Sequence, residues 1–227
     1  MPPSPILSDA DRQRIGDAAA EAESHTAGEI VTILAERSDD YGDVALAWSA
    51  IVALLALAAL AIAPGFYLGL YETLTGGWVH EWTPRLVFAV ALIVAALKFG
   101  GMYLMLLWRK LRLWLTPAPI RNARVRARAV TCFKVGAERR THGRTGILIY
   151  LSLAEHRAEI VADEAIAAKV PAEVWGDAMT AMLADLRQGR IADGMIVAVR
   201  EVGVVLAEHF PRHEGDVNEL PDRVIEV

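Results

Sequence analysis

Residues 44–63 form a run of 20 residues without a charge, which reads VALAWSAIVALLALAALAIA. As a helix rising about 1.5 Å per residue, it would measure about 30 Å, the thickness of a bilayer's hydrocarbon core. Buried helices of soluble proteins rarely run this far without a polar face. Pro64 and Gly65 then end the predicted helix. The stretch therefore predicts a membrane span. It is too long and too far from Met1 to be typical of a signal peptide, and acidic residues precede it.

A second predicted span covers residues 86–108 and contains one charge, Lys98. A charge in mid-membrane costs about 2.5–3.5 kcal/mol, which the many apolar neighbours and snorkelling of the lysine can offset. The alternative is that the span ends near Lys98 and the chain bends at Gly100 and Gly101. The following basic, apolar segment would then lie in the membrane interface. Both versions return the chain to its starting side.

Charge around the two spans predicts their orientation. Residues 109–144 carry 11 basic groups and one acidic group, whereas residues 66–82, in the loop between the spans, carry two acidic groups and no Lys or Arg. By the positive-inside rule, the basic side faces the cytoplasm. We therefore expect a protein of the bacterial inner (plasma) membrane with both termini cytoplasmic. The loop also carries aromatic residues suited to the headgroup zone: Phe66, Tyr67, Tyr71, Trp78 and Trp82.

The soluble parts are predicted to form one domain that the spans interrupt. A helix capped by Ser8 is followed by the strand-like run EIVTILAER, and these two elements alone cannot bury a core. After the spans come a basic helix, the apolar strand TGILIYLS, a second strand RAEIVAD in hairpin with it, and two further helices. The expected fold class is α/β, a mixed β-sheet flanked by helices on both faces, interrupted by a two-helix transmembrane hairpin.

The sequence predicts five segments, which together make up one soluble domain and one membrane hairpin. They are an N-terminal helix and first strand (1–43), the hairpin (44–108), a basic interfacial segment (109–119), the rest of the domain (120–210) and a C-terminal strap (211–227).

The order of EIVTILAERSDD, TGILIYLSLAEHRAEIVADEAI and PAEVWGDAMTAMLADLRQGRIADGMIVAV resembles the TPM domain family, in particular its bacterial membrane-embedded branch. The resemblance implies a mixed α/β sandwich. It also implies one of several activities: weak acid phosphatase, divalent-cation binding, or an accessory role for membrane complexes. Glu155 and Arg157 match part of the family's D-D-R-like turn. The glycines and tyrosine of its Gly-Tyr-Gly-Leu-Glu-like segment are missing, and only an acid at Asp163 or Glu164 is retained.

Five carboxylates form a candidate site for Ca²⁺ or Mg²⁺, because these ions prefer several converging oxygen ligands. They could converge at strand ends along one sheet edge, although the favoured interpretation is that each is a solvated loop carboxylate. Neither this set nor the rest of the chain requires a cofactor. The candidate ligands are Asp39, Asp40, Glu155, Asp163 and Glu164.

Nucleotide-binding, nucleophile-elbow, zincin and C-x-x-C motifs are absent, so the sequence leans away from an enzyme. The expected function is a non-enzymatic accessory, assembly or regulatory factor for a membrane complex, with another membrane protein as partner. The alternative is a weak cation-dependent phosphomonoesterase. The basic residues that follow the spans are expected to contact anionic lipid rather than nucleic acid: Arg109, Lys110, Arg112, Arg121 and Arg124.

Overall fold

The computed structural model describes residues 6–76, 82–136, 145–213 and 223–227. The chain divides into two compact units. One is formed by Met1–Asp39 together with Ala118–Val227, and the other by Asp40–Pro117. The first unit is therefore built from two pieces of chain that the second unit separates in sequence.

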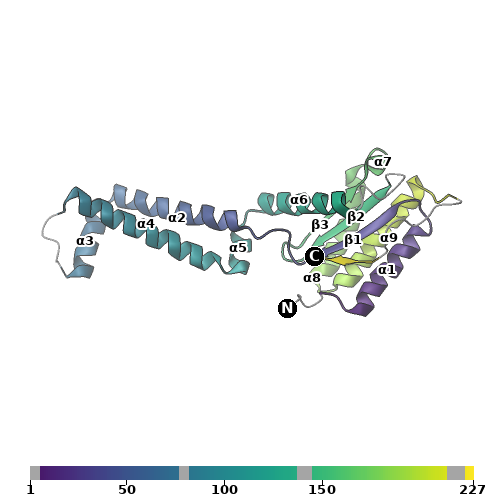
Figure 1. Cartoon of the computed structure of the whole chain (residues 1–227), viewed down its shortest axis with the longest axis horizontal. Helices are drawn as coiled ribbons and strands as arrows, with labels where there is room; N and C mark the ends of the chain where they lie inside the picture. Colours follow the sequence, from purple (N-terminus) through teal and green to yellow (C-terminus); the bar gives the residue numbers. More distant parts are fainter. Residues whose placement is uncertain (1–5, 77–81, 137–144, 214–222) are drawn as a thin grey trace. The chain divides into compact units, whose positions relative to one another are not determined.

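The first unit is organised around a four-stranded mixed sheet in the order β3-β2-β1-β4 (Figure 1). Strand β1 (Glu29–Ala35) pairs in parallel with β2 (Gly146–Ser152) over seven residues. Strand β3 (Arg157–Ala162) returns antiparallel to β2, and the short β4 (Ile225–Glu226) adds in parallel to the other side of β1. The two central strands thus come from opposite sides of the intervening segment.

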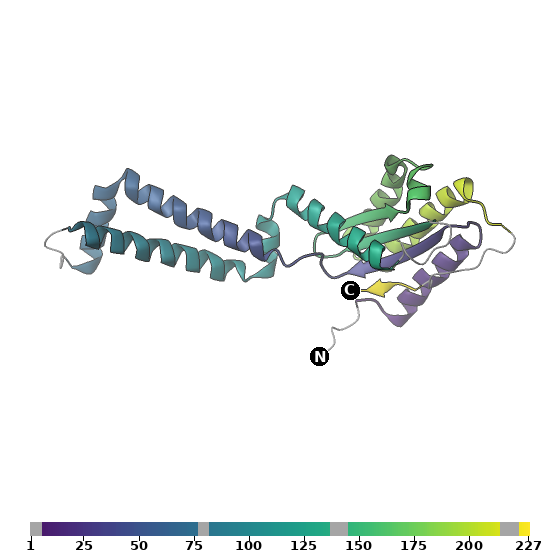
Figure 2. The same cartoon turned by 45° about the horizontal axis from the view of Figure 1, so that its top comes forward.

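Helices cover both faces of this sheet (Figure 2). One face carries α1 (Asp9–Glu23), α8 (Trp175–Arg187) and α9 (Ile191–His209), which share a core with alternate residues of β1 and β2. The other face carries α6 (Ala118–Gly136), whose Val125, Ala129 and Phe133 form its buried stripe. The alternation of inward and outward residues along each strand produces the two cores. The predicted α/β class, with a mixed sheet and helices on both faces, is confirmed.

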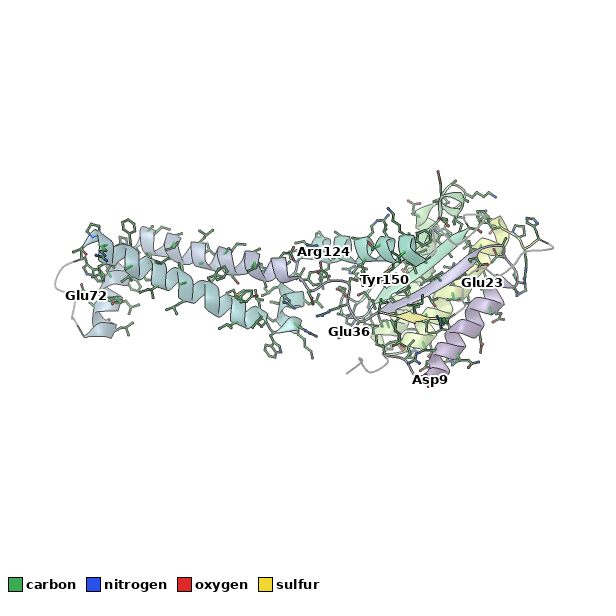
Figure 3. The ribbon with its side chains drawn as sticks, in the orientation of Figure 1. Asp9, Glu23, Glu36, Glu72, Arg124 and Tyr150 are labelled. Carbon is green, nitrogen blue, oxygen red and sulfur yellow. The ribbon has the colours of Figure 1, made fainter. Side chains whose placement is uncertain are left out.

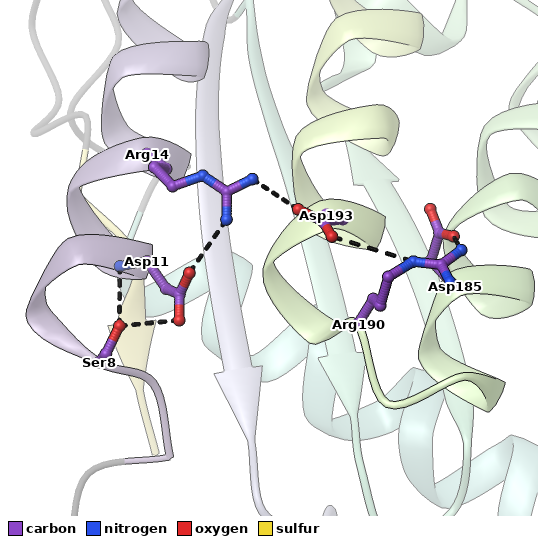
Figure 4. A network of polar contacts seen from close by, with 6 residues as sticks. All are labelled: Ser8, Asp11, Arg14, Asp185, Arg190 and Asp193. Atoms are coloured by element: carbon purple, nitrogen blue, oxygen red, sulfur yellow. Dashed lines mark hydrogen bonds and ion pairs between the residues drawn. The ribbon is translucent and has the colours of Figure 1, made fainter.

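Polar side chains hold the α1, α8 and α9 layer together (Figure 4). Ser8 caps α1 by accepting a hydrogen bond from the Asp11 N–H at 3.1 Å. Arg14 reaches from α1 to Asp193 at the start of α9 at 2.5 Å. Asp193 also lies 3.9 Å from Arg190, which pairs with Asp185 at the end of α8. The cap and the ion pairs fix the N-terminal helix against the two C-terminal helices.

A close helix crossing explains one glycine. A Cβ on Gly203 of α9 would lie 2.7 Å from the Cβ of Ala22 in α1. Only a residue without a side chain permits this separation of the two helices.

The rest of the first unit is short connections. The turn of α7 (Glu164–Ala167) follows β3, and a single 3-10 turn, η1 (Ala172–Val174), leads directly into α8. In the C-terminal strap, β4 docks on β1, while residues 214–222 lie outside the described residues.

The second unit is dominated by two long apolar helices that lie side by side, α2 (Gly42–Ile62) and α4 (Pro84–Leu106). Both are long and apolar enough to cross a membrane. In the most apolar part of each helix, only 11% of α2 and 6% of α4 is buried within the protein. A core helix of a soluble protein would be mostly buried instead. Helix α4 continues without a break through Lys98, Gly100 and Gly101, so the alternative of a bend at the two glycines is wrong.

Two shorter helices complete the second unit. The segment between the long helices, predicted as a loop, is largely the helix α3 (Pro64–Thr75), which begins directly after Ala63. Trp78 of this segment lies outside the described residues. The basic segment after α4 forms α5 (Arg109–Leu115), where the Trp48 indole N–H of α2 donates to the Leu115 carbonyl at 3.2 Å.

Candidate functional site

The carboxyl ends of the parallel strands β1 and β2 meet at one edge of the sheet, where α/β proteins commonly build their sites. Backbone pairing continues past the strands there, because Leu153 N–H donates to the Ala35 carbonyl at 3.0 Å and Ala154 N–H to that of Glu36 at 2.9 Å. The turn that follows brings its next residue, Glu155, back toward the chain leaving β1. The polar residues gathered here, which we call the carboxyl-edge cluster, are Ser38, Tyr150, Ser152 and Glu155.

Glu155 is the centre of this cluster and is only 3% exposed. One carboxylate oxygen accepts a hydrogen bond from the Ser38 backbone N–H at 3.1 Å. The other accepts a hydrogen bond from the Ser152 hydroxyl. A buried carboxylate needs such donors, because its removal from water is costly without them. Glu155 therefore ties the β2–β3 turn to the segment that leaves β1.

The hydroxyl groups of the cluster form a connected chain. Ser38 donates from its hydroxyl to the Ser152 oxygen at 3.0 Å, and its oxygen lies 3.0 Å from the Tyr150 hydroxyl. Tyr150 is fully buried, and this burial raises the pKa of its phenol, although the hydrogen bond with Ser38 opposes the shift. The phenol therefore stays protonated at neutral pH. Figure 3 shows Tyr150 in the central strands.

Arg124 of α6 lies beside this edge and pairs with Asp39, with the Arg124 Nε 3.2 Å from a carboxylate oxygen (Figure 3). Asp39 directly follows Ser38, so it lies at the same edge as Glu155. Asp40 is the next residue. Two of the five predicted metal ligands, Asp39 and Glu155, thus come from the segments at this edge, whereas Asp40 begins the second unit.

The other two predicted ligands are at the opposite end of the sheet. Asp163 follows β3, and its carboxylate accepts a hydrogen bond from the Gly146 N–H, the first residue of β2, at 3.2 Å. Glu164 follows it and begins α7. Since β2 has seven residues, about 20 Å of strand separates this end from Glu155 at about 3.3 Å per residue.

The expectation that all five carboxylates meet at one edge is therefore wrong, because β3 runs antiparallel to β2. Coordination needs oxygens within about 2.6 Å of one ion. Among the described residues, no group of three or more His, Cys, Asp or Glu side chains is arranged to hold a metal ion.

The hydroxyl partners of Glu155 were not among the predicted site residues. The signal was present in TGILIYLS, because Tyr150 and Ser152 are two residues apart and so point to the same face of the strand. Ser38 gave no such signal, since it lies in a loop whose approach to the turn depends on the pairing of β1 with β2.

Cys132 is half-buried on α6, and burial raises the pKa of its thiol, opposed by Arg128. The thiol is therefore neutral at physiological pH, which makes it a poor nucleophile.

The basic residues form a second candidate site. On α5, Arg109 and Lys110 are exposed. Trp108, directly before the helix, and Trp114, within it, are exposed as well. Arg112 is half-buried on the same helix. Arg121 and Arg124 belong instead to α6 of the first unit, where Arg124 pairs with Asp39.

The architecture defines a class of protein before any comparison. It is an α/β domain with a mixed sheet, whose two central parallel strands are joined through a pair of exposed apolar helices.

Comparison with known proteins finds a family match within the domain. Residues 121–205 match the family model described as TPM domain. The match confirms, over those residues, the resemblance that the sequence pattern predicted. Among solved structures, it is similar to the NMR structure of the BA42 protein from the psychrophilic bacterium Bizionia argentinensis. That likeness covers 99% of this chain and 98% of the other, at 17% identity and a TM-score of 0.56, and it concerns the fold. A search of curated proteins finds no match.

Proposed function

We propose that this protein is a membrane-anchored TPM domain protein, of the membrane-embedded type, that serves as an accessory or assembly factor for a membrane complex. Helices α2 and α4 cross the inner membrane as a hairpin, and the TPM domain lies in the cytoplasm. One observation carries the anchoring proposal: β1 and β2 are neighbours in one sheet, while the two apolar helices lie between them in sequence.

This pairing restricts the path of the chain through a bilayer. Seven residues of β1 pair with seven of β2, and each backbone group in that ladder needs its partner. The chain between them must therefore start and finish on the same side of the membrane. Two crossings satisfy this requirement, whereas one or three do not.

Charge supports the cytoplasmic side for the domain. Residues 109–144, which follow the second crossing, carry 11 basic residues and one acidic residue. Residues 64–83, between the crossings, carry Glu72 and Glu81 and no Lys or Arg. Lysine and arginine are retained on the cytoplasmic side of short segments next to spans. Lys98 lies eight residues before the end of α4, about 12 Å along the helix, so its amine can snorkel toward that same side.

The basic residues also supply a partner, the anionic headgroups of the cytoplasmic leaflet. Arg109, Lys110 and Arg112 stand on the short helix that follows α4, next to exposed tryptophans suited to the interface. Each basic residue near an anionic surface contributes about 1 kcal/mol of attraction. Arg121 and Arg124 extend the basic run along the sequence, although Arg124 is engaged with Asp39.

The accessory role is favoured by how the carboxyl-edge cluster uses its polar groups. The Glu155 carboxylate, the two serine hydroxyls and the Tyr150 phenol interact with one another. Such an arrangement stabilises the junction between the sheet and the chain leaving β1, which suits a domain that presents a fixed surface near a membrane.

A cation-dependent phosphatase is the second candidate, favoured by the proximity of Glu155 and Asp39 at the carboxyl edge. In this version Asp39 and Glu155, both in the first unit, supply ligands for the ion and the general base. Asp163 and Glu164 take no part, since they lie at the other end of the sheet.

Two measurements test the proposal. A fluorescent-protein fusion after Val227 should be active in a bacterial host, and an alkaline phosphatase fusion at the same position should be inactive. The opposite pair of results refutes the cytoplasmic orientation. The purified full chain should not hydrolyse a generic phosphomonoester with Mg²⁺ or Ca²⁺. Turnover that is lost in the double variant Asp39→Asn and Glu155→Gln, and kept in Asp163→Asn, would establish the phosphatase instead.

A further inference from the structure

Helix α3 exposes an apolar stripe that none of the described residues of its own unit covers. Phe66, Leu70 and Leu74 are 68%, 47% and 79% exposed. They recur every four residues, so they lie on one face of the helix. Three large apolar side chains so exposed on one short helix are typical of an interaction surface rather than of a solvated one.

The Glu72 carboxylate and the Tyr71 ring of α3 are turned toward Trp82 instead. The Trp82 indole N–H donates to the Glu72 carboxylate at 2.5 Å, and the rings of Tyr71 and Trp82 meet edge to face at 5.6 Å. Glu72 is the only charged residue of α3 (Figure 3). Its engagement leaves the exposed stripe without a charge of its own.

Helix α3 is also too short to cross a bilayer. Its 12 residues measure about 18 Å, against a hydrocarbon core of about 30 Å. A further crossing would in addition place β1 and β2 on opposite sides, which their pairing forbids. The helix starts directly after Ala63, where α2 ends with the strongly exposed Ile62. It therefore begins at the depth where the first crossing leaves the hydrocarbon core.

We infer that α3 is an in-plane interfacial helix, which inserts Phe66, Leu70 and Leu74 into the membrane leaflet opposite the TPM domain. This inference rests on the proposed hairpin crossing. Continuity supports lipid as the occupant, because the stripe follows on from the exposed apolar side chains of α2. Aromatic residues at the same level, such as Tyr67, suit the headgroup region. The helix would fix the depth of the hairpin from the far side, as the basic α5 does from the near side.

The test places single cysteines on α3 of the full-length protein, in a Cys132→Ser background. Leu70→Cys and Leu74→Cys report on the stripe. Gly65→Cys is the control, because its Cβ meets nothing within 4 Å and lies about 140° around the helix from Leu70. Each cysteine carries an environment-sensitive fluorophore after reconstitution into phosphatidylcholine vesicles. Quenching by iodide on both sides is compared with quenching by lipid that bears a spin label near its headgroup.

We expect labels at 70 and 74 to be quenched several-fold more by the spin-labelled lipid than the label at 65, and several-fold less by iodide. Equal iodide quenching at all three positions would overturn the inference. Protection of 70 and 74 from both quenchers would overturn it as well, since a second copy of the chain would then cover the stripe.

Labels at two exposed positions of the long helices separate this inference from the hairpin itself. Leu54→Cys and Leu92→Cys, in α2 and α4, should be quenched by a lipid spin-labelled deep in its acyl chain. If the deep spin label quenches positions 54 and 92 while iodide quenches positions 70 and 74, the interfacial helix is refuted and the hairpin stands. If all four are aqueous, both are refuted.

Discussion

The buried carboxylate of Glu155 offers the sharpest test of how the sheet edge is held together. Truncation by Glu155→Ala removes the acceptor for the Ser38 N–H and for the Ser152 hydroxyl. A buried donor left without a partner costs about 1–3 kcal/mol. For two donors, with Glu155 only 3% exposed, we expect a loss of about 3 kcal/mol of stability.

Hydrogen exchange measures this loss in the intact protein in detergent micelles. A change of about 3 kcal/mol in opening free energy corresponds to about 100-fold faster exchange. We expect this acceleration for the amides of β1 and β2, which the cluster joins. Glu155→Gln keeps a carbonyl acceptor and should cost about 1 kcal/mol. The exposed Glu173→Ala should change stability by less than about 0.5 kcal/mol.

Exchange in Glu155→Ala at the rate of the Glu173→Ala control would refute the reasoning. It would mean that Ser38 and Ser152 find other acceptors without cost. A loss in Glu155→Gln as large as that in Glu155→Ala would show that the negative charge, rather than the acceptor geometry, carries the effect.

Two further substitutions probe the packing of α1 and the docking of β4. Gly203→Ala should destabilise the domain by about 1–3 kcal/mol through overpacking against Ala22. The control Gly176→Ala should not, because a Cβ there meets open space. Equal thermal unfolding midpoints for the two variants would contradict the close crossing of α1 and α9. At Glu226, burial raises the pKa, but hydrogen bonds from Arg12 and from the Ile6 N–H outweigh it and lower the pKa overall. The stabilisation is therefore present above the ordinary glutamate pKa of about 4.3 and lost as pH falls through the lowered value. The melting temperature of Glu226→Gln should thus fall below that of the parent at pH 7 and converge with it in acid; a difference that grows in acid would contradict this sign.

Much of the fold followed from sequence because strong local patterns coincide with the elements. The charge-free run from residue 44 became α2, and TGILIYLS became the central strand β2, buried along its whole length. The order of the strands in the sheet could not be predicted from local sequence pattern alone, because the pairing of β1 with β2 joins residues more than 100 positions apart. The two pieces were predicted to form one domain because one helix and one strand cannot bury a core alone.

Helix α3 was predicted as a loop, because its aromatic residues and glycines are typical of a loop at the membrane interface. Its helical character depends on Pro64 at the first turn and on the contacts of Tyr71 and Glu72 with Trp82. Those contacts are tertiary, so periodicity alone did not reveal them.

The five candidate ligands do not share one edge of the sheet, for a topological reason that the sequence already contained. The second and third strands were predicted as a hairpin, and a hairpin returns the chain to the edge where it began. Asp163 therefore lies beside Gly146, one strand length from Glu155. Acidic residues before and after an antiparallel strand belong to opposite edges.

The central claim is that both pieces of the TPM domain lie on one side of a membrane that the intervening hairpin crosses twice. Single cysteines at Ser24 and Arg187, in a Cys132→Ser background, sample the two pieces at positions that are exposed. They are challenged with a membrane-impermeant maleimide in intact cells and in inside-out vesicles. If both pieces lie in the cytoplasm, both cysteines react only in the inside-out vesicles. Reaction of one in cells and the other in vesicles, or recovery of the chain in the soluble fraction without detergent, would contradict it.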